Sequence, residues 1–505
     1  MQKLISKIFG IIKSDKTIVL LSLLYIIIPI CFFFIGWLKF PLAILFCTLF
    51  GFLTYKIHQN ICGSPIILIN KSTKHYWIIT SSISAFWVYL SGIGGFCYQN
   101  SDHWVRNPIF RDLSTYSWPV IYNLASESEI VQQVVGSGNV AFVYYYTWWL
   151  PVASLSKLFH LGNLSRNFLL LCWAFLGILL IIYCINRHIG KCSYVTTVLL
   201  IIFSGLDAII PFLKNASLSM TEHIEWWANY FQYSSNTTQL FWVFNQSIPI
   251  WLTVGILLQL RDNKFVAAVS SLVFPYSPWA VYGMIPIAIA GTFKQNKKLK
   301  EVIVPPLNIL NIISPLVILL IYGSFYLSGY GSTRSFGLKI LEVANKRNFI
   351  CNYIIFIFLE AGIYFCIMGQ SIQKYRYYLT VLIELLVIPL FSINDGNFYM
   401  RASIPALFLL MTFTIRFLIS QSKDNDSIRL KILIIICIIG MYTPFTEINR
   451  SLTFTLSNND DSLRQEQVYS LGNMQTDDKS LIYIVKRQFF AYDYENAFFF
   501  KYLAR

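Results

Sequence analysis

The chain has 505 residues, of which 56% are hydrophobic and only 12% are charged, and its mean hydropathy is +0.57. A soluble domain carries about 25% charged residues, so this composition excludes an ordinary soluble protein. Apolar runs long enough to cross a hydrocarbon core of about 30 Å recur along most of the chain. The net charge of +15 is explained by cytoplasmic lysine and arginine and by anionic headgroups; no nucleic-acid-binding motif accompanies it.

The apolar runs predict an all-α polytopic membrane protein, a bundle of about 12–13 transmembrane helices. Segment 1–16 is basic and amphipathic, and no small-residue cleavage site follows the first run, so we expect a retained span. Pro275 and Pro278 should divide the run 265–293 into a bent pair. The predicted spans are 17–38, 39–57, 76–97, 166–186, 193–212, 240–260, 265–293, 305–328, 349–369, 376–393, 402–421 and 428–445.

Positive charge orients these spans, because cytoplasmic loops carry the excess of lysine and arginine. The segments expected outside are 98–165, 213–239, 329–348, 394–401 and 446–505. The aromatic stretch 139–159 then cannot cross the membrane, and we expect an interfacial helix whose tyrosine and tryptophan rings settle at the headgroup layer. The alternative is a true span that inverts the topology after it.

Four regions follow from this layout: an N-terminal membrane hairpin, 1–75; a core with two outer loops, 76–300; C-terminal transmembrane helices, 301–445; and an outer tail, 446–505. The tail carries a strand-like run at 481–485 and, being small for an independent domain, should pack on the outer loops. The absence of a defensible internal repeat weakens an inverted-repeat transporter.

Asp102, His103 and Arg106 gather directly after an apolar run. Deep in lipid each charge would cost about 2.5–3.5 kcal/mol, whereas at the mouth of a helix the cluster can face water, a phosphate or a sugar. Asp102 could accept a proton from a hydroxyl or help to hold a divalent cation. The alternative is a helix cap with an Asp102–Arg106 surface pair worth less than about 1 kcal/mol. Asp112, beside Arg111, is expected to be structural.

A second cluster holds Glu222, His223 and Glu225, followed by hydroxyl and amide side chains over 232–239. On a helix the two glutamates would share a face, and His223 would not. The sequence is not HExxH, so zinc-dependent hydrolysis has little support. Hydroxyl, amide and indole groups suit sugar recognition; the alternative is an interfacial aromatic belt with solvated polar residues.

Basic residues in two further outer segments are candidates for phosphate binding. Arg401 lies where a span begins, and a guanidinium at a helix N-terminus can bind phosphate oxygens; the alternative is a snorkelling side chain. Arg334 and Lys339 face outside against the positive-inside tendency, which either a lipid phosphate or ordinary headgroup contact would explain. Asp395, in a turn before Arg401, completes the candidate substrate-binding set.

This arrangement over 76–300 resembles the GT-C class of integral-membrane glycosyltransferases, including protein O-mannosyltransferase-like and lipid A aminoarabinose transferase-like enzymes. The resemblance implies that Asp102 is the base or a metal contact, that Glu222 or Glu225 is the second-loop acid, and that Arg401 lies near the lipid phosphate. No DxD or WWD sequence occurs, and an additional hairpin precedes the usual first span. The segments that look similar to bacterial members are Asp102-His103-Trp104, Tyr144-Tyr145-Tyr146, Ser204-Gly205-Leu206-Asp207 and Met400-Arg401-Ala402-Ser403.

We therefore expect an enzyme of the bacterial cytoplasmic membrane that acts on its extracytoplasmic face in cell-envelope glycan or polysaccharide synthesis. It would move a sugar from a polyprenyl-phosphate donor to an acceptor hydroxyl of a glycan, lipid or protein, with inversion. The lipid bilayer is a partner and nucleic acid is not. No cofactor is required by the sequence, although a divalent cation, Mg or Mn, held by Asp102 and Glu222 is left open.

Two alternatives are kept. The first is a transporter or flippase of lipid-linked saccharide, for which the mid-span acids Glu360 and Glu384 provide some support because intramembrane ionisable groups are usually functional. The second is a polymerase or ligase with two lipid-linked substrates. The sugar and the acceptor are not defined by the sequence.

Overall fold

The structure is a computed structural model that describes residues 15–61, 72–126, 129–136, 138–293, 307–329, 336–373, 375–393, 398–421, 428–457, 468–473 and 479–505. Eight helices within these ranges are long and apolar enough to cross a membrane, so the prediction of a helical multi-pass membrane protein is confirmed. They are α2 (Asp15–Trp37), α3 (Phe40–Asn60), α8 (Asn163–Ile189), α11 (Asn236–Leu257), α15 (Ile309–Leu327), the run α17 (Lys346–Ile357), η6 (Phe358–Gly362) and α18 (Ile363–Met368), α22 (Ile404–Gln421), and the pair α23 (Ile428–Gly440) and α24 (Tyr442–Ser457).

Several predicted spans are shorter helices, which is why eight such helices are found where 12–13 were expected. The run 76–97 stops early because Gly92, Gly94 and Gly95 adopt positive φ angles of 78°, 83° and 75°, which L side chains rarely tolerate. The bent pair at 265–293 is present as two helices separated around its prolines. The shorter helices are α4 (Lys74–Leu90), α9 (Tyr194–Ile202), α10 (Ile209–Asn215), α12 (Val266–Ser271), α13 (Ala280–Thr292), α19 (Gln370–Gln373), and α20 (Tyr378–Val387) with η7 (Ile388–Leu390).

The aromatic stretch 139–159 does not form one helix. It consists of β2 (Asn139–Phe142), η2 (Thr147–Trp149) and α7 (Leu150–Leu158). Tyr146, Trp148 and Trp149 are fully buried rather than placed at a surface, and the Trp148 indole donates a hydrogen bond to the Tyr25 hydroxyl at 3.0 Å. The expected interfacial helix is therefore wrong, because these rings pack inside the protein against α2.

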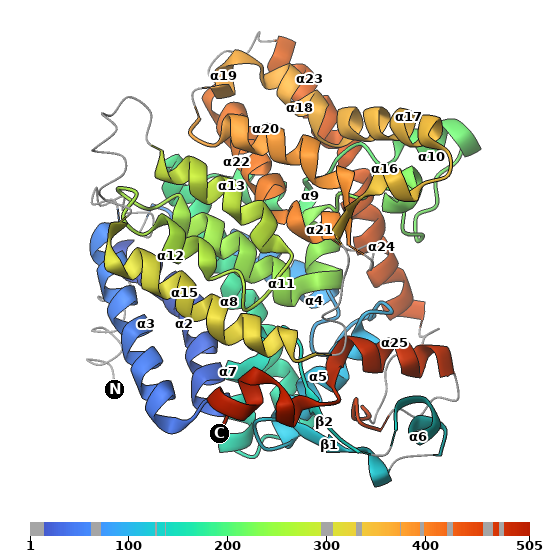
Figure 1. Ribbon diagram of the computed structural model, residues 1–505. Helices are drawn as coiled ribbons and strands as arrows, with labels where there is room; N and C mark the ends of the chain where they lie inside the picture. Colours follow the sequence, from blue (N-terminus) through green and yellow to red (C-terminus); the bar gives the residue numbers. More distant parts are fainter. Residues whose placement is uncertain are drawn as a thin grey trace.

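The first loop, between α4 and α8, and the tail form one layer at one end of the bundle, seen at the bottom of Figure 1. Strand β2 pairs antiparallel with β1 (Ile121–Asn123) and with β5 (Phe490–Ala491), with Ala141 opposite Ala491. The tail therefore packs on the loop, as expected. The remaining elements of the layer are α5 (His103–Thr115), η1 (Leu124–Ser126), α6 (Glu129–Val135), α25 (Lys479–Phe489), η8 (Tyr494–Asn496) and η9 (Phe499–Leu503).

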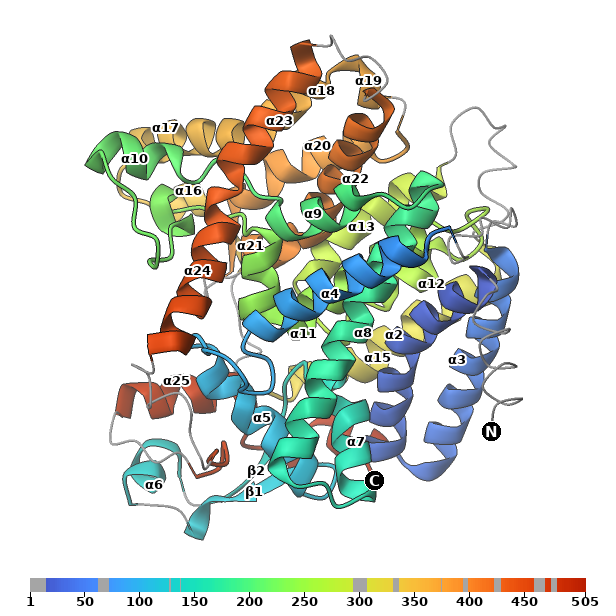
Figure 2. The same cartoon turned by 180° about the vertical axis from the view of Figure 1, so that it is seen from behind.

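The strand predicted at 481–485 is instead part of helix α25. Ile482, Val485 and Phe489 are buried apolar side chains of this helix, and their spacing of three and four residues places them on one helical face. Figure 2 shows α23 and α24 following one another along one side of the bundle toward this layer.

Short elements complete the side of the molecule above the layer. β3 (Phe336–Leu338) and β4 (Phe391–Ile393) pair antiparallel, which brings the segment 329–348, predicted to lie outside, together with the end of the predicted span 376–393. The other elements here are η3 (Glu225–Ala228), α16 (Lys339–Glu342) and α21 (Phe398–Ala402).

The end of the chain closes against the N-terminal hairpin. Ala504 bridges to Leu38, the Lys39 amide donates to the Leu503 carbonyl at 2.9 Å, and the Arg505 amide donates to the Trp37 carbonyl at 3.0 Å. The predicted first and last regions thus share an interface at the turn between α2 and α3.

Candidate functional site

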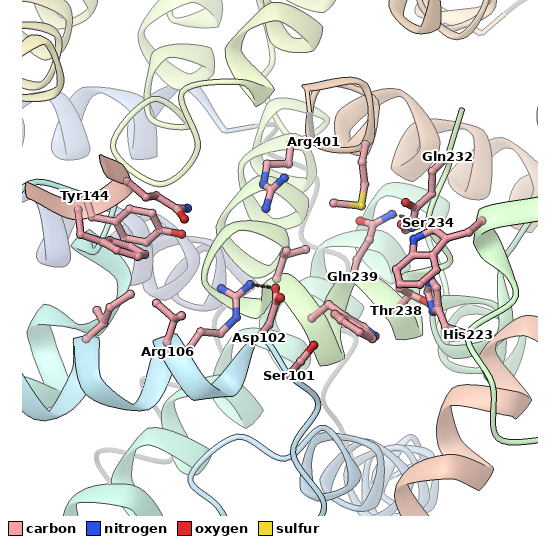
Figure 3. Close-up of a pocket in the computed structure, with 18 residues that line it drawn as sticks. Ser101, Asp102, Arg106, Tyr144, His223, Gln232, Ser234, Thr238, Gln239 and Arg401 are labelled. Carbon is pink, nitrogen blue, oxygen red and sulfur yellow. Dashed lines mark hydrogen bonds and ion pairs between the residues drawn. The ribbon is translucent and has the colours of Figure 1, made fainter. Parts of the chain in front are cut away.

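A cavity of about 290 Å³ lies where the layer meets the bundle. Its lining comes from α5, η3, α11, α21 and α25, which lie far apart in the sequence. Figure 3 shows Arg401 opposite Asp102 and Arg106, with Tyr144 at one end and His223 at the other. The first loop, the second loop and the segment before the predicted span 402–421 therefore converge on one cavity.

Asp102 and Arg106 form an ion pair on the first turn of α5. Asp102 occupies the N-cap position but makes no capping hydrogen bond; its carboxylate lies 2.6 Å from Arg106 Nη2 and its side chain is 40% exposed. Arg106 is buried, and its Nη1 donates to Asn245 Oδ1 at 2.6 Å. The pairing anticipated as an alternative is present, but the buried guanidinium holds the carboxylate at the cavity wall instead of leaving the pair on a free surface.

His103 does not line the cavity and is buried. Its Nε2 lies 3.2 Å from the Phe241 carbonyl and its Nδ1 lies 3.2 Å from Gln99 Nε2. The carbonyl can only accept, so Nε2 carries the hydrogen. Burial, and then the charge of Arg106, lower the pKa of His103 to about 4. It is a neutral support that ties α5 to α11 beside the non-helical residue Val243.

His223 lines the cavity and lies between two carboxyl groups. Its Nδ1 is 2.7 Å from Glu447 Oε1 and its Nε2 is 3.8 Å from Glu225 Oε2. Burial lowers the pKa of His223, but the hydrogen bond with Glu447 and the charge of Glu225 raise it more, so the net direction is upward. Trp242 also donates to Glu447 at 3.0 Å, and Arg450 pairs with the same carboxylate.

The two glutamates of the second loop have different environments. Glu225 is buried, and it accepts hydrogen bonds from the Ser235 amide and from Gln232 Nε2, both at 2.9 Å. Burial raises the pKa of Glu225 to about 7, although the charge of His223 lowers it. Glu222 is exposed in a bend before η3 and does not line the cavity, so the helix that would align the two side chains is not present.

Arg401 is buried in α21 and lines the cavity. Lys339 does not line it; its Nζ donates to the Tyr230 carbonyl and lies 4.1 Å from the centre of the Tyr399 ring. Burial lowers the pKa of Lys339 to about 8. Lys339 thus joins the second loop to α21. Arg334 and Asp395 lie outside the described residues.

Within the described ranges, one carboxylate lines the cavity. Asp102 is the carboxylate among the lining residues, it is already paired with Arg106, and Arg401 adds a second positive charge. No group of three or more histidine, cysteine, aspartate or glutamate side chains that could hold a metal occurs in the described part of the chain. Mg²⁺ is commonly held by one or two carboxylates together with substrate phosphates, and Asp102 is the lining residue that would supply such a carboxylate.

Behind the cavity lies a buried pair of acids. Trp227 Nε1 is 3.2 Å from Asp207 Oδ1 and 3.3 Å from Glu360 Oε1. Asp207 also accepts from Ser204 at 3.0 Å and from Thr443 at 2.9 Å. Burial raises the pKa of Asp207, against the lowering effect of these hydrogen bonds. Asp207 and Glu360 thus converge on one indole N–H in a buried site.

Sequence reasoning did not single out Glu447 or Arg450. Both lie beyond residue 445, where the last predicted span was ended, and the structure continues that helix to Ser457. Their only sequence signal was one further turn of amphipathic spacing, with Glu447 and Arg450 three residues apart.

Comparison with family models, with curated proteins and with solved structures finds no match to this chain. The fold itself defines the class: a helical, multi-pass membrane protein. Its distinguishing feature is a charged cavity lined by segments between the apolar helices and by the first turns of α11. The GT-C resemblance stays a prediction.

Proposed function

We propose that the cavity binds a sugar carried on a polyprenyl phosphate, and that the protein is a GT-C-like glycosyltransferase of a bacterial cytoplasmic membrane. One observation carries the proposal: Asp102, His223 and Arg401, from three distant segments, line one cavity of about 290 Å³. That volume is close to the lower end of small-molecule sites, about 300 Å³. The mixture of acid, imidazole, guanidinium, amide and hydroxyl groups suits a sugar joined to a phosphate.

Positive charge supports the placing of the phosphate. Arg106 and Arg401 both line the cavity and both are buried. A guanidinium in a site of low dielectric binds phosphate oxygens strongly. Because the donor's lipid tail stays in the bilayer, a transferase needs such a site where the loops meet the membrane helices. In this proposal the donor enters from the outer leaflet.

The proposed reaction is a single displacement at the anomeric carbon. The acceptor hydroxyl attacks the face opposite the phosphate, a new carbon–oxygen bond forms, and the bond to the phosphate oxygen breaks. Asp102 accepts the hydroxyl proton, as a positioned carboxylate can. The phosphate leaves with the electron pair, and Arg401 stabilises its developing charge. Inversion at the anomeric carbon follows from this geometry of attack.

Purified protein in liposomes, supplied with a radiolabelled polyprenyl-phosphate sugar and candidate glycan, lipid and protein acceptors, tests this function. We expect transfer to one acceptor class, and a loss of at least 100-fold in Asp102→Asn and in Arg401→Gln. Glu222→Gln is the matched control, because this acid of the second loop is exposed and lies outside the cavity lining. Wild-type transfer in both cavity variants, with normal folding, would exclude the assignment.

The buried acids favour a second candidate, a proton-coupled transporter or flippase of lipid-linked saccharide. Asp207 and Glu360 form the pair described above, and Glu384 is also buried. Intramembrane ionisable groups commonly mark proton or ion pathways. If labelled saccharide crosses the liposome membrane with no new glycosidic bond, and Glu360→Gln stops it, transport replaces transfer. A product lengthened on a second lipid-linked glycan would indicate a polymerase or ligase.

A further inference from the structure

A second cavity, of about 640 Å³, lies beside the start of α8 and shares no lining residue with the candidate site. Its lining includes Arg111 on α5, Lys157 on α7, His160, and Arg166 on α8. We call this space the basic cavity, after these four residues. Its other described lining residues carry no acidic side chain, so the cavity walls bear a concentrated positive charge.

Arg166 is the most informative member. Its side chain is buried, with 8% of the residue exposed, and Nη2 donates to Asn163 Oδ1 at 3.0 Å. Its Nε is also buried and has no hydrogen-bond partner among the described residues. A buried charged donor without a partner is costly. An anion in the cavity would supply the missing acceptor.

The positive charges of Arg111 and Lys157 are only partly neutralised by nearby acidic groups. Arg111 pairs with the buried carboxylate of Asp112 at 2.7 Å. Lys157 donates to the Tyr116 carbonyl and lies 4.1 Å from the centre of the Trp118 ring. Burial, and then the charge of Arg505, lower the pKa of Lys157 to about 8. One carboxylate therefore faces several positive charges, which a bound anion would offset.

The start of α8 adds to the attraction. This helix begins at Asn163, and the preceding Gly162 provides no side-chain cap. The first amide groups of a long helix and its dipole favour a negative charge. Asn163 lines the basic cavity, so these groups lie at its edge.

The surroundings identify the source of the anion. Leu158 and Phe159 precede the helix, Leu164 and Phe168 follow within its first two turns, and all four are exposed. Helix α8 is also one of the candidate membrane spans. Large exposed apolar side chains beside a basic cavity at the start of a span match the division of a phospholipid into acyl chains and headgroup.

We propose that the basic cavity binds the phosphate of an anionic phospholipid headgroup, with the acyl chains lying along the exposed face at the start of α8. The phosphate oxygens accept hydrogen bonds from Arg166 and contact Lys157 and Arg111. This site is separate from the sugar-phosphate cavity and does not depend on its proposed activity. It would anchor α5, α7 and α8 to the headgroup layer.

The test measures the melting temperature of purified full-length protein in a neutral detergent with phosphatidylglycerol, phosphatidylcholine or inorganic phosphate added. We expect phosphatidylglycerol to raise the melting temperature and phosphatidylcholine to leave it unchanged. The Lys157→Gln/Arg166→Gln double variant should need at least ten times more phosphatidylglycerol for the same rise. Lys214→Gln, an exposed lysine on α10, is the control and should behave as wild type.

A second measurement keeps the proposal testable if the double variant folds poorly. Native mass spectrometry of Arg166→Lys, which keeps the charge but loses the guanidinium fork, should show fewer co-purified anionic lipids than wild type. Equal lipid retention and equal stabilisation in all variants would overturn the site. Stabilisation by inorganic phosphate without any effect of phosphatidylglycerol would retain an anion site and overturn the lipid assignment.

Discussion

His223 links the candidate cavity to the charges buried behind it. Its imidazole lies between Glu447 and Glu225, so a protonated ring satisfies both neighbours and a neutral ring leaves two carboxyl groups close together. The pKa of His223 is raised overall, despite the opposing effect of burial, and burial raises the pKa of Glu225 to about 7. Both groups hold protons more tightly in the folded state than in the unfolded chain.

The sign of the pH dependence follows from these two shifts. A raised folded pKa gives stability that is complete below the unfolded pKa and is lost as pH rises through the folded pKa. For Glu225 the loss spans the interval from 4.5 to about 7, and for His223 it begins at about 6.5. We predict that the protein in detergent loses on the order of 1–3 kcal/mol between pH 5 and pH 8.

Thermal denaturation across that range checks the prediction. Glu225→Gln should flatten the profile, because the amide stays neutral and Gln232 can turn its own amide to meet it. Glu222→Gln changes an exposed acid three residues earlier and should keep the wild-type slope. Equal slopes in both variants would show that Glu225 does not titrate in this interval.

Asp112 provides a second prediction at the level of one side chain. It is fully buried and accepts hydrogen bonds from Tyr122 at 2.7 Å, Ser470 at 3.0 Å and the Leu471 amide at 2.8 Å. The expectation of a structural role is confirmed by these contacts, which join α5 to the tail. Asp112→Asn replaces an acceptor with a donor at a crowded position and should destabilise the protein by about 1–3 kcal/mol.

Limited proteolysis with a melting curve measures this effect. We expect faster cleavage within the tail of Asp112→Asn and a lower melting temperature. The exposed Asp493→Asn, in the same layer, serves as the control. Cleavage at the wild-type rate would mean that the tail is held independently of the Asp112 carboxylate.

At the level of elements, the position of α21 depends on close packing against α13. A Cβ added at Gly283 would lie 2.0 Å from the Ala402 carbonyl oxygen, and Arg401 precedes that residue. We predict that Gly283→Ala displaces α21, costs about 1–3 kcal/mol, and reduces any activity that depends on Arg401. Gly51→Ala on α3 is the control, because its added Cβ meets nothing within 4 Å and should stabilise the helix slightly.

Melting curves and the transfer assay, run together on the two glycine variants, check this packing. A Gly283→Ala protein with wild-type stability and activity would show that α21 can move without cost. The comparison separates the close approach at Gly283 from the general effect of alanine in a helix.

The helices and strands also show which structural features can be predicted from local sequence patterns. Long apolar helices were predictable because hydrophobic length is a local property. The run 193–212 was not, since it breaks after Ile202, where an added Cβ on Gly205 would lie 1.8 Å from Glu360 Oε2. That approach involves residues far apart in the chain. The pattern at 481–485 fits a strand or a helix, and packing of Val485 and Phe489 decides for the helix.

In the candidate site, too, the features that depend on local sequence were predictable and the contacts between distant residues were not. Asp102 and Arg401 were predictable because charged groups beside apolar runs are costly and therefore conspicuous. His223 was also found, but its partner Glu447 was not, since only the folded chain places α24 beside the second loop. The aromatic residues at 144–149 were assigned to the membrane interface because a tyrosine- and tryptophan-rich composition is found both at membrane interfaces and in buried cores.

On the scale of the whole molecule, the C-terminal residues of the tail and the α2–α3 hairpin hold the layer to the bundle. Phe499 is fully buried in η9, with its ring 5.0 Å from that of Phe325 and 6.1 Å from that of Phe33. It thereby joins the tail to α15 and to the N-terminal hairpin. The backbone contacts of Leu503 and Ala504 with Lys39 and Leu38 extend this interface.

Phe499→Ala should therefore cost about 3–5 kcal/mol, the usual effect of removing a buried phenylalanine, and should loosen the tail and the hairpin together. Phe498→Ala is the matched control, because the neighbouring ring is exposed. Hydrogen exchange of full-length protein in detergent would report the change, with faster exchange expected both at the Lys39 amide, which bonds to Leu503, and in β5. Faster exchange confined to the tail would indicate that the hairpin is stable without it, whereas a coupled loss in the hairpin and in β5 requires one cooperative unit that joins α2, α3, the layer and the cavity between the layer and the bundle.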